Sequence, residues 1–286
     1  MSATRADALR WLREERLAVL VELVQVRGSV PREAGTRMLV AANDACGTIG
    51  GGHLEHEAIL EARALLRDGQ GFVAAPELRR CLSLGPSLGQ CCGGSVELSW
   101  RPLDAAVLEA WPPATPRFCL QLHGAGHVGR ALVRILLAVP CRIHWIDARE
   151  TFEPLPEAQS DPSPRLAQVQ VHQCEEPQSL VSHAQPGDLV LIATHRHDLD
   201  ERIAAEALQR NDLGWVGMIG SATKRARILR RLLHRGLPPE HSRALVCPIG
   251  ISGCEGVGAK EPGVIALAVA AQLLQTSARS ARAPDR

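Results

Sequence analysis

The spacing of apolar residues divides the chain into two parts with different patterns. The first hundred residues mix short apolar runs with glycine and proline turns, and this mixture predicts a small α+β module. From Phe118 onward, apolar strands alternate with helical segments, which is typical of a parallel, doubly wound sheet. We therefore predict an α/β protein with a C-terminal Rossmann-like domain and a smaller N-terminal α+β domain.

The N-terminal domain is expected to cover residues 1–104. Its predicted helices span residues 4–14 and 53–66, and its predicted strands span residues 17–26, 36–40, 48–49 and 95–100. A proline-rich stretch, Trp111 to Pro116, indicates an interdomain linker over residues 105–117.

The C-terminal domain is expected over residues 118–275, and polar residues 276–286 are predicted to form a disordered tail. The predicted strands span residues 118–123, 142–146, 169–172, 189–193 and 215–219. The predicted helices span residues 128–138, 199–210, 222–235 and 262–275.

Composition narrows the class of protein. Of the 286 residues 45% are apolar, and 32 basic residues nearly cancel 31 acidic ones, which argues against nucleic acid or a membrane surface as the partner. From the polar start, Met1 to Asp7, we expect no secretory signal, and we expect no membrane span because no apolar run reaches about 18 residues. We expect a cytoplasmic protein whose nine cysteines are reduced. The absence of tyrosine excludes a Tyr-x-x-x-Lys dehydrogenase.

The sequence Gly-Gln-Cys-Cys-Gly-Gly over residues 89–94 is the most unusual segment. Adjacent Cα atoms lie about 3.8 Å apart, below the span of about 4.4–6.8 Å usual for a disulfide, so Cys91 and Cys92 are poorly placed to bridge each other. A thiol pair in a glycine turn suits a reactive thiolate beside an anion or a soft metal. On these residues alone, a bulged turn with two buried thiols is an equally good interpretation.

Residues 124–129, Gly-Ala-Gly-His-Val-Gly, match G-x-G-x-x-G between a predicted strand and a predicted helix. In that motif Gly124 permits the turn, Gly126 lets a phosphate approach the backbone, and Gly129 lets the helix pack on the strand. Asp147 follows 23 residues after Gly124, where an acid would bind a ribose hydroxyl. The loop is also compatible with another phosphorylated ligand or none, and His127 with a helix cap.

Seven stretches together resemble the XdhC/CoxI family, the accessory proteins of xanthine dehydrogenase and related molybdenum hydroxylases. They are residues 28–33, 47–55, 89–94, 124–129, 194–198, 218–221 with Lys224, and 247–250, and Lys260-Glu261-Pro262 follows them in the expected order. The resemblance implies a protein that binds the molybdenum cofactor, holds it while a cysteine desulfurase exchanges oxo for sulfide, and delivers it to the apo-hydroxylase. It also implies contact with cofactor-biosynthesis proteins and no catalytic residue. We expect a homodimer.

Three glycine segments are candidate phosphate cradles, because each would place free N–H groups at a helix N-terminus. They are Gly50-Gly51-Gly52, the Gly126 loop, and Gly220-Ser221, and each is also the pattern of an ordinary tight turn. We expect Cys92, followed by Gly93 and Gly94, to be the more important thiol for molybdenum, with Cys91 beside it.

Further candidates flank these segments. His195 and His197 follow a predicted strand and are expected to contact the pterin or the metal, or else to be a solvated pair. Arg32 suits phosphate or pterin, or else a surface ion pair. The basic stretch from Lys224 to Arg243 fits either an acidic partner or a solvated helix face.

Two other functions remain open at this point. An NAD-dependent oxidoreductase would use Gly124–Gly129 and Asp147, with His195 as its acid or base, but would leave the cysteine turn unexplained. A thiol- or metal-responsive binding protein would have no hydroxylase partner.

Overall fold

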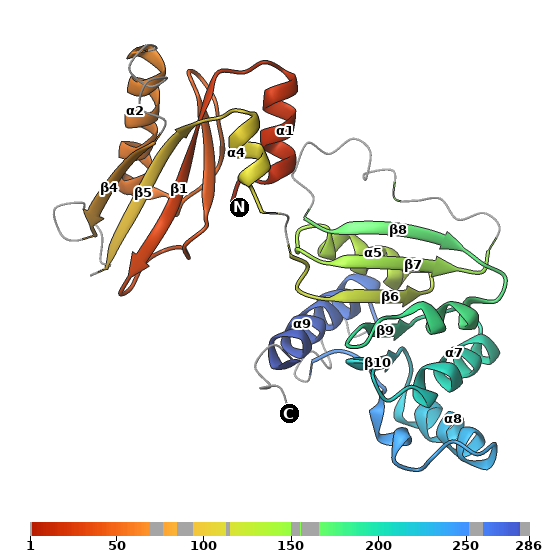
Figure 1. Ribbon diagram of the computed structural model, residues 1–286. Helices are drawn as coiled ribbons and strands as arrows, with labels where there is room; N and C mark the ends of the chain where they lie inside the picture. The colour runs from red at the N-terminus through yellow and green to blue at the C-terminus, as the bar shows by residue number, and fades with distance from the viewer. Residues whose placement is uncertain are drawn as a thin grey trace. The chain divides into compact units, whose positions relative to one another are not determined.

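The computed structural model describes residues 2–68, 77–84, 94–112, 115–149, 155, 166–251 and 260–280. It divides into two compact units, Met1–Ala114 and Thr115–Arg286, which are described separately (Figure 1). Within the described residues, no helix is both long and apolar enough to cross a membrane.

An antiparallel sheet in the order β3-β2-β1-β5-β4 forms the first unit. The strands are β1 (Ala18–Arg27), β2 (Arg37–Ala41), β3 (Ala45–Gly47), β4 (Leu78–Ser83) and β5 (Ser95–Pro102). The helices are α1 (Arg5–Arg13), α2 (Gly52–Asp68) and α4 (Ala105–Ala110). In Figure 1, α2 lies on one face of the sheet and α1 with α4 on the other.

Both faces of this sheet are apolar, because successive residues of the central strand β1 point to opposite faces and apolar residues stand at both kinds of position. Val19 and Val21 join the cluster that includes Leu54 and Ala58 of α2. Leu20 points the other way and packs with Trp11 of α1. The sheet is therefore the middle layer of three.

Two of the elements predicted for the first unit need correction. The third strand is β3, residues 45–47, whereas the sequence predicts a strand at 48–49. Residues 105–110 of the predicted linker form α4, where Asp104 caps the first turn and Val107 is buried against α1. The prediction of a linker there is wrong, because a short helix covers apolar surface.

A fully parallel sheet in the order β11-β10-β9-β6-β7-β8 forms the second unit, as predicted for a Rossmann-like domain. The strands are β6 (Cys119–His123), β7 (Arg142–Asp147), β8 (Gln168–Gln173), β9 (Leu189–Ile192), β10 (Trp215–Met218) and β11 (Leu245–Val246). Its first strand in the chain, β6, lies at the centre, with later strands added on either side.

Helices cover both faces of this sheet. One apolar cluster joins α5 (His127–Leu136) and α9 (Pro262–Ser280), and the other joins α7 (His197–Gln209) and α8 (Ala222–His234). The 3-10 helices η2 (Pro177–His183) and η3 (His241–Ala244) complete the unit. Residues 276–280 belong to the predicted tail but continue α9. Residues 281–286 lie outside the described part.

Candidate functional site

The chain reverses its direction of sheet growth between β6 and β9, which are neighbours although β7 and β8 separate them in the chain. Ligands of open α/β sheets bind beside such a point, outside the carboxyl ends of the strands. The loop after β6 touches the loop after β9, because a Cβ at position 124 would lie 2.2 Å from the carbonyl oxygen of Ala193. Gly124 also has φ +123°, so only glycine suits this turn.

The three motif glycines have different surroundings. A Cβ at position 129 would lie 2.2 Å from the carbonyl oxygen of Gly124, so Gly129 lets α5 pack against the loop. At Gly126 a Cβ would meet nothing within 4 Å among the described residues, which leaves space for a ligand above the backbone. Gly126 is the N-cap of α5, no side chain caps that end, and His127 is exposed as the first helical residue.

Asp147 is the last residue of β7, and its side chain is 4% exposed. Its carboxylate accepts hydrogen bonds from the amide of Ala125 at 2.5 Å and from Arg149 Nε and Nη2 at 2.8 and 2.9 Å. Burial opposes ionisation, but the hydrogen bonds from Arg149 and the backbone outweigh it and hold the pKa of Asp147 below its ordinary value. A ribose hydroxyl would have to compete with these donors.

His123, directly before the loop, is completely buried. Its Nε2 lies 3.3 Å from Gln121 Oε1, and its Nδ1 has no hydrogen-bond partner among the described residues. Burial lowers its pKa to about 3, so the imidazole is neutral at physiological pH.

A buried ion pair connects the ends of β9 and β10. Lys224 Nζ lies 2.6 Å from Asp200 Oδ2 and donates to the Ile219 carbonyl at 2.8 Å. Asp200, 1% exposed, also accepts from the Thr194 hydroxyl at 2.6 Å. The charges of Lys224 and Asp200 neutralise each other, and their hydrogen bonds hold the loop after β9 against the start of α8.

Gly220 and Ser221 lie within this network. A Cβ at position 220 would be 2.6 Å from Lys224 Cδ and 3.2 Å from Cys247 Sγ. The Ser221 hydroxyl caps α8 by accepting from the Lys224 amide at 3.2 Å. The amide of Lys224 is therefore engaged, contrary to the expectation of free N–H groups here. Burial raises the pKa of Cys247, partly opposed by Lys224 and Arg225.

His195 and His197 are both exposed, and they differ in position. His195 precedes α7, whereas His197 is its first residue and lines a pocket between α7 and α8 with Arg227. Their expected contact with a pterin or metal stays a prediction.

In the first unit, the motif stretches meet at one turn. A Cβ at Gly50 would lie 2.8 Å from Pro31 Cγ, and one at Gly94 would lie 2.5 Å from the Arg27 carbonyl oxygen. Gly94 would also approach the Ser29 carbonyl oxygen, at 2.6 Å. The structure thus brings together three stretches that lie far apart in the chain.

The glycines before α2 do not offer the expected free amides. Glu55, in the first turn of α2, accepts from the amides of Ile49 and Gly51 at 3.0 Å each and from the Thr48 hydroxyl. The Gly50 amide donates to Thr48 Oγ1 at 3.1 Å. The prediction of free N–H groups at Gly50 and Gly51 is therefore wrong, because a carboxylate of the same helix binds where a phosphate was expected.

The thiol candidates Cys91 and Cys92 lie outside the described residues. Within the described residues, no group of three or more His, Cys, Asp or Glu side chains is placed to hold a metal ion. Arg32 is exposed and makes no ion pair in the described part of the chain.

Sequence reasoning missed Asp200, Glu55 and Arg149. Two of them carried a usable signal, since Asp200 and Glu55 are acids in the first turn of a helix that follows a polar or glycine-rich loop. Arg149 carried none, because its partner is set by the turn after β7.

Comparison with protein families gives two matches. A model described as the XdhC Rossmann domain matches residues 120–273, and one described as the XdhC and CoxI family matches residues 11–74.

Individual proteins are also similar. The uncharacterized protein YqeB of Escherichia coli (strain K12) is 29% identical over 90% of this chain and 43% of its own length. A probable xanthine dehydrogenase subunit of Bacillus subtilis (strain 168) is 33% identical over 37% of this chain and 29% of its own length. The chain thus spans less than half the length of these two relatives.

Among solved structures, one described as a xanthine dehydrogenase from Bacillus halodurans is similar, with a TM-score of 0.69 and 20% identity. The match covers 99% of this chain and 98% of that one. At this identity the likeness shows a shared fold.

Proposed function

Because the chain belongs to the XdhC and CoxI family of xanthine dehydrogenase accessory proteins, we propose that it carries the molybdenum cofactor. In this proposal it binds the cofactor as cargo, holds it for sulfuration by a cysteine desulfurase and delivers it to an apo molybdenum hydroxylase. The observation that carries the proposal is the meeting of the turn at residues 27–32 with Gly50 and Gly94. Assembly as a homodimer and a cytoplasmic location stay predictions of the sequence.

The residues present suit such a cargo. A phosphorylated pterin needs cations and backbone amides, and the exposed Arg32 stands on the turn where the motifs meet. The open space above Gly126 at the N-terminus of α5 offers a second place for phosphate. Soft molybdenum favours thiolate, and we assign that contact to Cys92, with Cys91 beside it.

The test measures molybdenum and pterin in protein purified from a host that makes the cofactor. We expect near-equimolar amounts in the wild type and loss of both in Cys92→Ser. The matched control is Cys81→Ser, which removes an exposed thiol on β4 and should leave both contents unchanged. Equal retention in Cys92→Ser would refute the cysteine turn as the site, and absence of both from the wild type would refute the carrier function.

Nucleotide binding is the second candidate, favoured by the sheet order and the open Gly126. An NAD-dependent oxidoreductase with this loop should be stabilised by about 2.7 kcal/mol at NADH concentrations a hundredfold above Kd. We expect no such stabilisation, because Arg149 and Ala125 already engage the carboxylate that would bind the ribose. Thermal unfolding with and without NADH decides between the two functions.

A further inference from the structure

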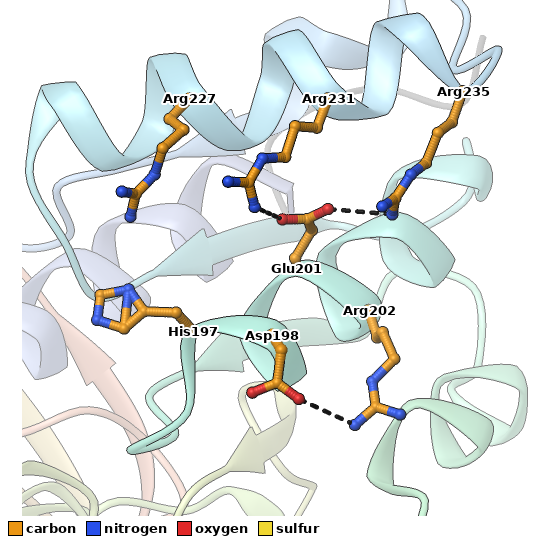
Figure 2. Close-up of a pocket in the computed structure, with 7 residues that line it drawn as sticks. All are labelled: His197, Asp198, Glu201, Arg202, Arg227, Arg231 and Arg235. Atoms are coloured by element: carbon orange, nitrogen blue, oxygen red, sulfur yellow. Dashed lines mark hydrogen bonds and ion pairs between the residues drawn. The ribbon is translucent and has the colours of Figure 1, made fainter.

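A strongly basic groove separates α7 from α8 in the second unit. Its volume is about 770 Å³, and every residue that lines it is titratable. Figure 2 shows the side chains of Arg227, Arg231 and Arg235 extending from one helix toward the other. The facing residues are His197, Asp198, Glu201 and Arg202.

Cations outnumber acids in this groove. Glu201, with a side chain only 7% exposed, is shared by Arg231 at 2.8 Å and Arg235 at 3.0 Å. Those arginine side chains remain 56% and 66% exposed, so one buried carboxylate orients two guanidinium groups toward solvent without neutralising both. Glu201 is therefore a positioning residue for the cationic surface.

Arg227 differs from the other arginines of the row. Among the described residues it has no ion-pair partner, and Figure 2 shows it extending toward His197 without an acid between them. Asp198 is already paired, with Arg196 at 2.5 Å and with Arg202 of the groove itself at 3.5 Å. The end of the groove at the N-terminus of α7 thus holds a guanidinium with a free hydrogen-bonding edge.

The lining indicates which class of occupant fits. Small-molecule pockets are mostly apolar, whereas the residues that line this groove are all polar or charged. The net charge of +1 for the chain does not suit a nucleic acid, which needs an extended basic surface. Arginines four residues apart on a helix repeat about every 6 Å, a spacing that carboxylates along an acidic peptide segment can match.

We propose that this groove is a docking site for an acidic segment of a partner protein, with Arg227 as its anchor. The proposal goes beyond cofactor carriage and requires no bound cofactor. Electrostatic docking of this kind raises the rate of encounter and selects partners with complementary charge.

The experiment uses a fluorescein-labelled hexaglutamate peptide and follows its anisotropy with the full chain at low and physiological salt. We expect saturable binding that weakens as salt rises. Arg227→Glu should weaken binding about tenfold, since it removes one cation and adds a repelling acid. The matched control is Arg230→Glu, an equal change of charge at an exposed position of α8 that does not line the groove. It should change the affinity by no more than about twofold.

A second variant tests the opposite direction. Asp198→Asn removes an exposed acid from the groove and should tighten binding about twofold. The proposal is overturned if the peptide does not bind, or if both glutamate variants lose affinity equally. It is also overturned if a duplex oligonucleotide, or inorganic pyrophosphate alone, binds the groove more tightly than the peptide. The molybdenum content of Arg227→Glu is measured separately. It tests cofactor carriage, which predicts a cargo, whereas peptide binding tests the docking groove, which does not.

Discussion

The turn before α2 and the loop before α5 both place glycines at the N-terminus of a helix, yet their backbone amides are used differently. Before α2, Glu55 accepts from Ile49 and Gly51 and closes the turn. Before α5, Gly126 faces open space, and the first turn of that helix contains no acid. An acid in the first helical turn can therefore occupy an anion site that glycine spacing alone would suggest.

The largest effect should separate two glycines of the loop before α5. Gly129→Ala places a Cβ against the Gly124 carbonyl, so we expect a loss of about 3 kcal/mol in the free energy of unfolding. Gly126→Ala should change it by less than about 0.5 kcal/mol, because its φ of −71° suits alanine and the space is open. Urea unfolding of both variants measures the difference. Equal losses would show that the loop before α5 is as closed as the turn before α2.

A smaller effect is expected from replacing the Asp147 carboxylate, which accepts a hydrogen bond from Ala125 in the loop before α5. Asp147→Asn should lower the free energy of unfolding by about 2 kcal/mol at pH 7, because the Arg149 guanidinium loses its charged partner. The pKa of Asp147 is lower in the folded state than in the unfolded chain, so its stabilisation is present above the unfolded value of about 3.9. The stabilisation is lost as pH falls through the folded value.

The advantage of wild type over Asp147→Asn should therefore shrink in acid, and urea unfolding between pH 7 and pH 3 measures it. The matched control, Asp212→Asn, removes an exposed acid that pairs with Arg210 in the same unit. It should have a much smaller effect. A difference that stays constant with pH would contradict the assigned role of the Asp147 charge.

The smallest effect on stability should come from opening the closed turn. Glu55→Ala removes the acceptor for two amides and the Thr48 hydroxyl, at a cost of about 1 kcal/mol. The freed amides should then bind sulfate, so added sulfate should raise the Tm of Glu55→Ala more than that of wild type. Glu57→Ala, an exposed acid on the same helix, is the control. An equal response to sulfate in all three proteins would show that Glu55 does not occupy an anion site.

Local patterns predicted much of the fold, and their failures have physical reasons. The alternation of strands and helices after Phe118 predicted the parallel sheet, which the structure confirms. The strand β4 was missed because its residues are mostly exposed, and its pairing with β5 depends on backbone hydrogen bonds rather than on an apolar pattern. The helix α4 was missed because proline-rich sequence follows it closely, while its stability comes from packing against α1.

Interactions between neighbouring residues fix the helix and strand periods and the tight turn at Gly124, and the sequence shows these directly. Which charges meet depends on tertiary packing. Lys224 reaches Asp200 across 24 residues, and Arg231 reaches Glu201 across 30, because α7 and α8 pack on the same face of the sheet. Coulomb interaction depends on distance in space and on burial, so spacing along the chain could not reveal these pairs or the groove that Arg231 and Glu201 line.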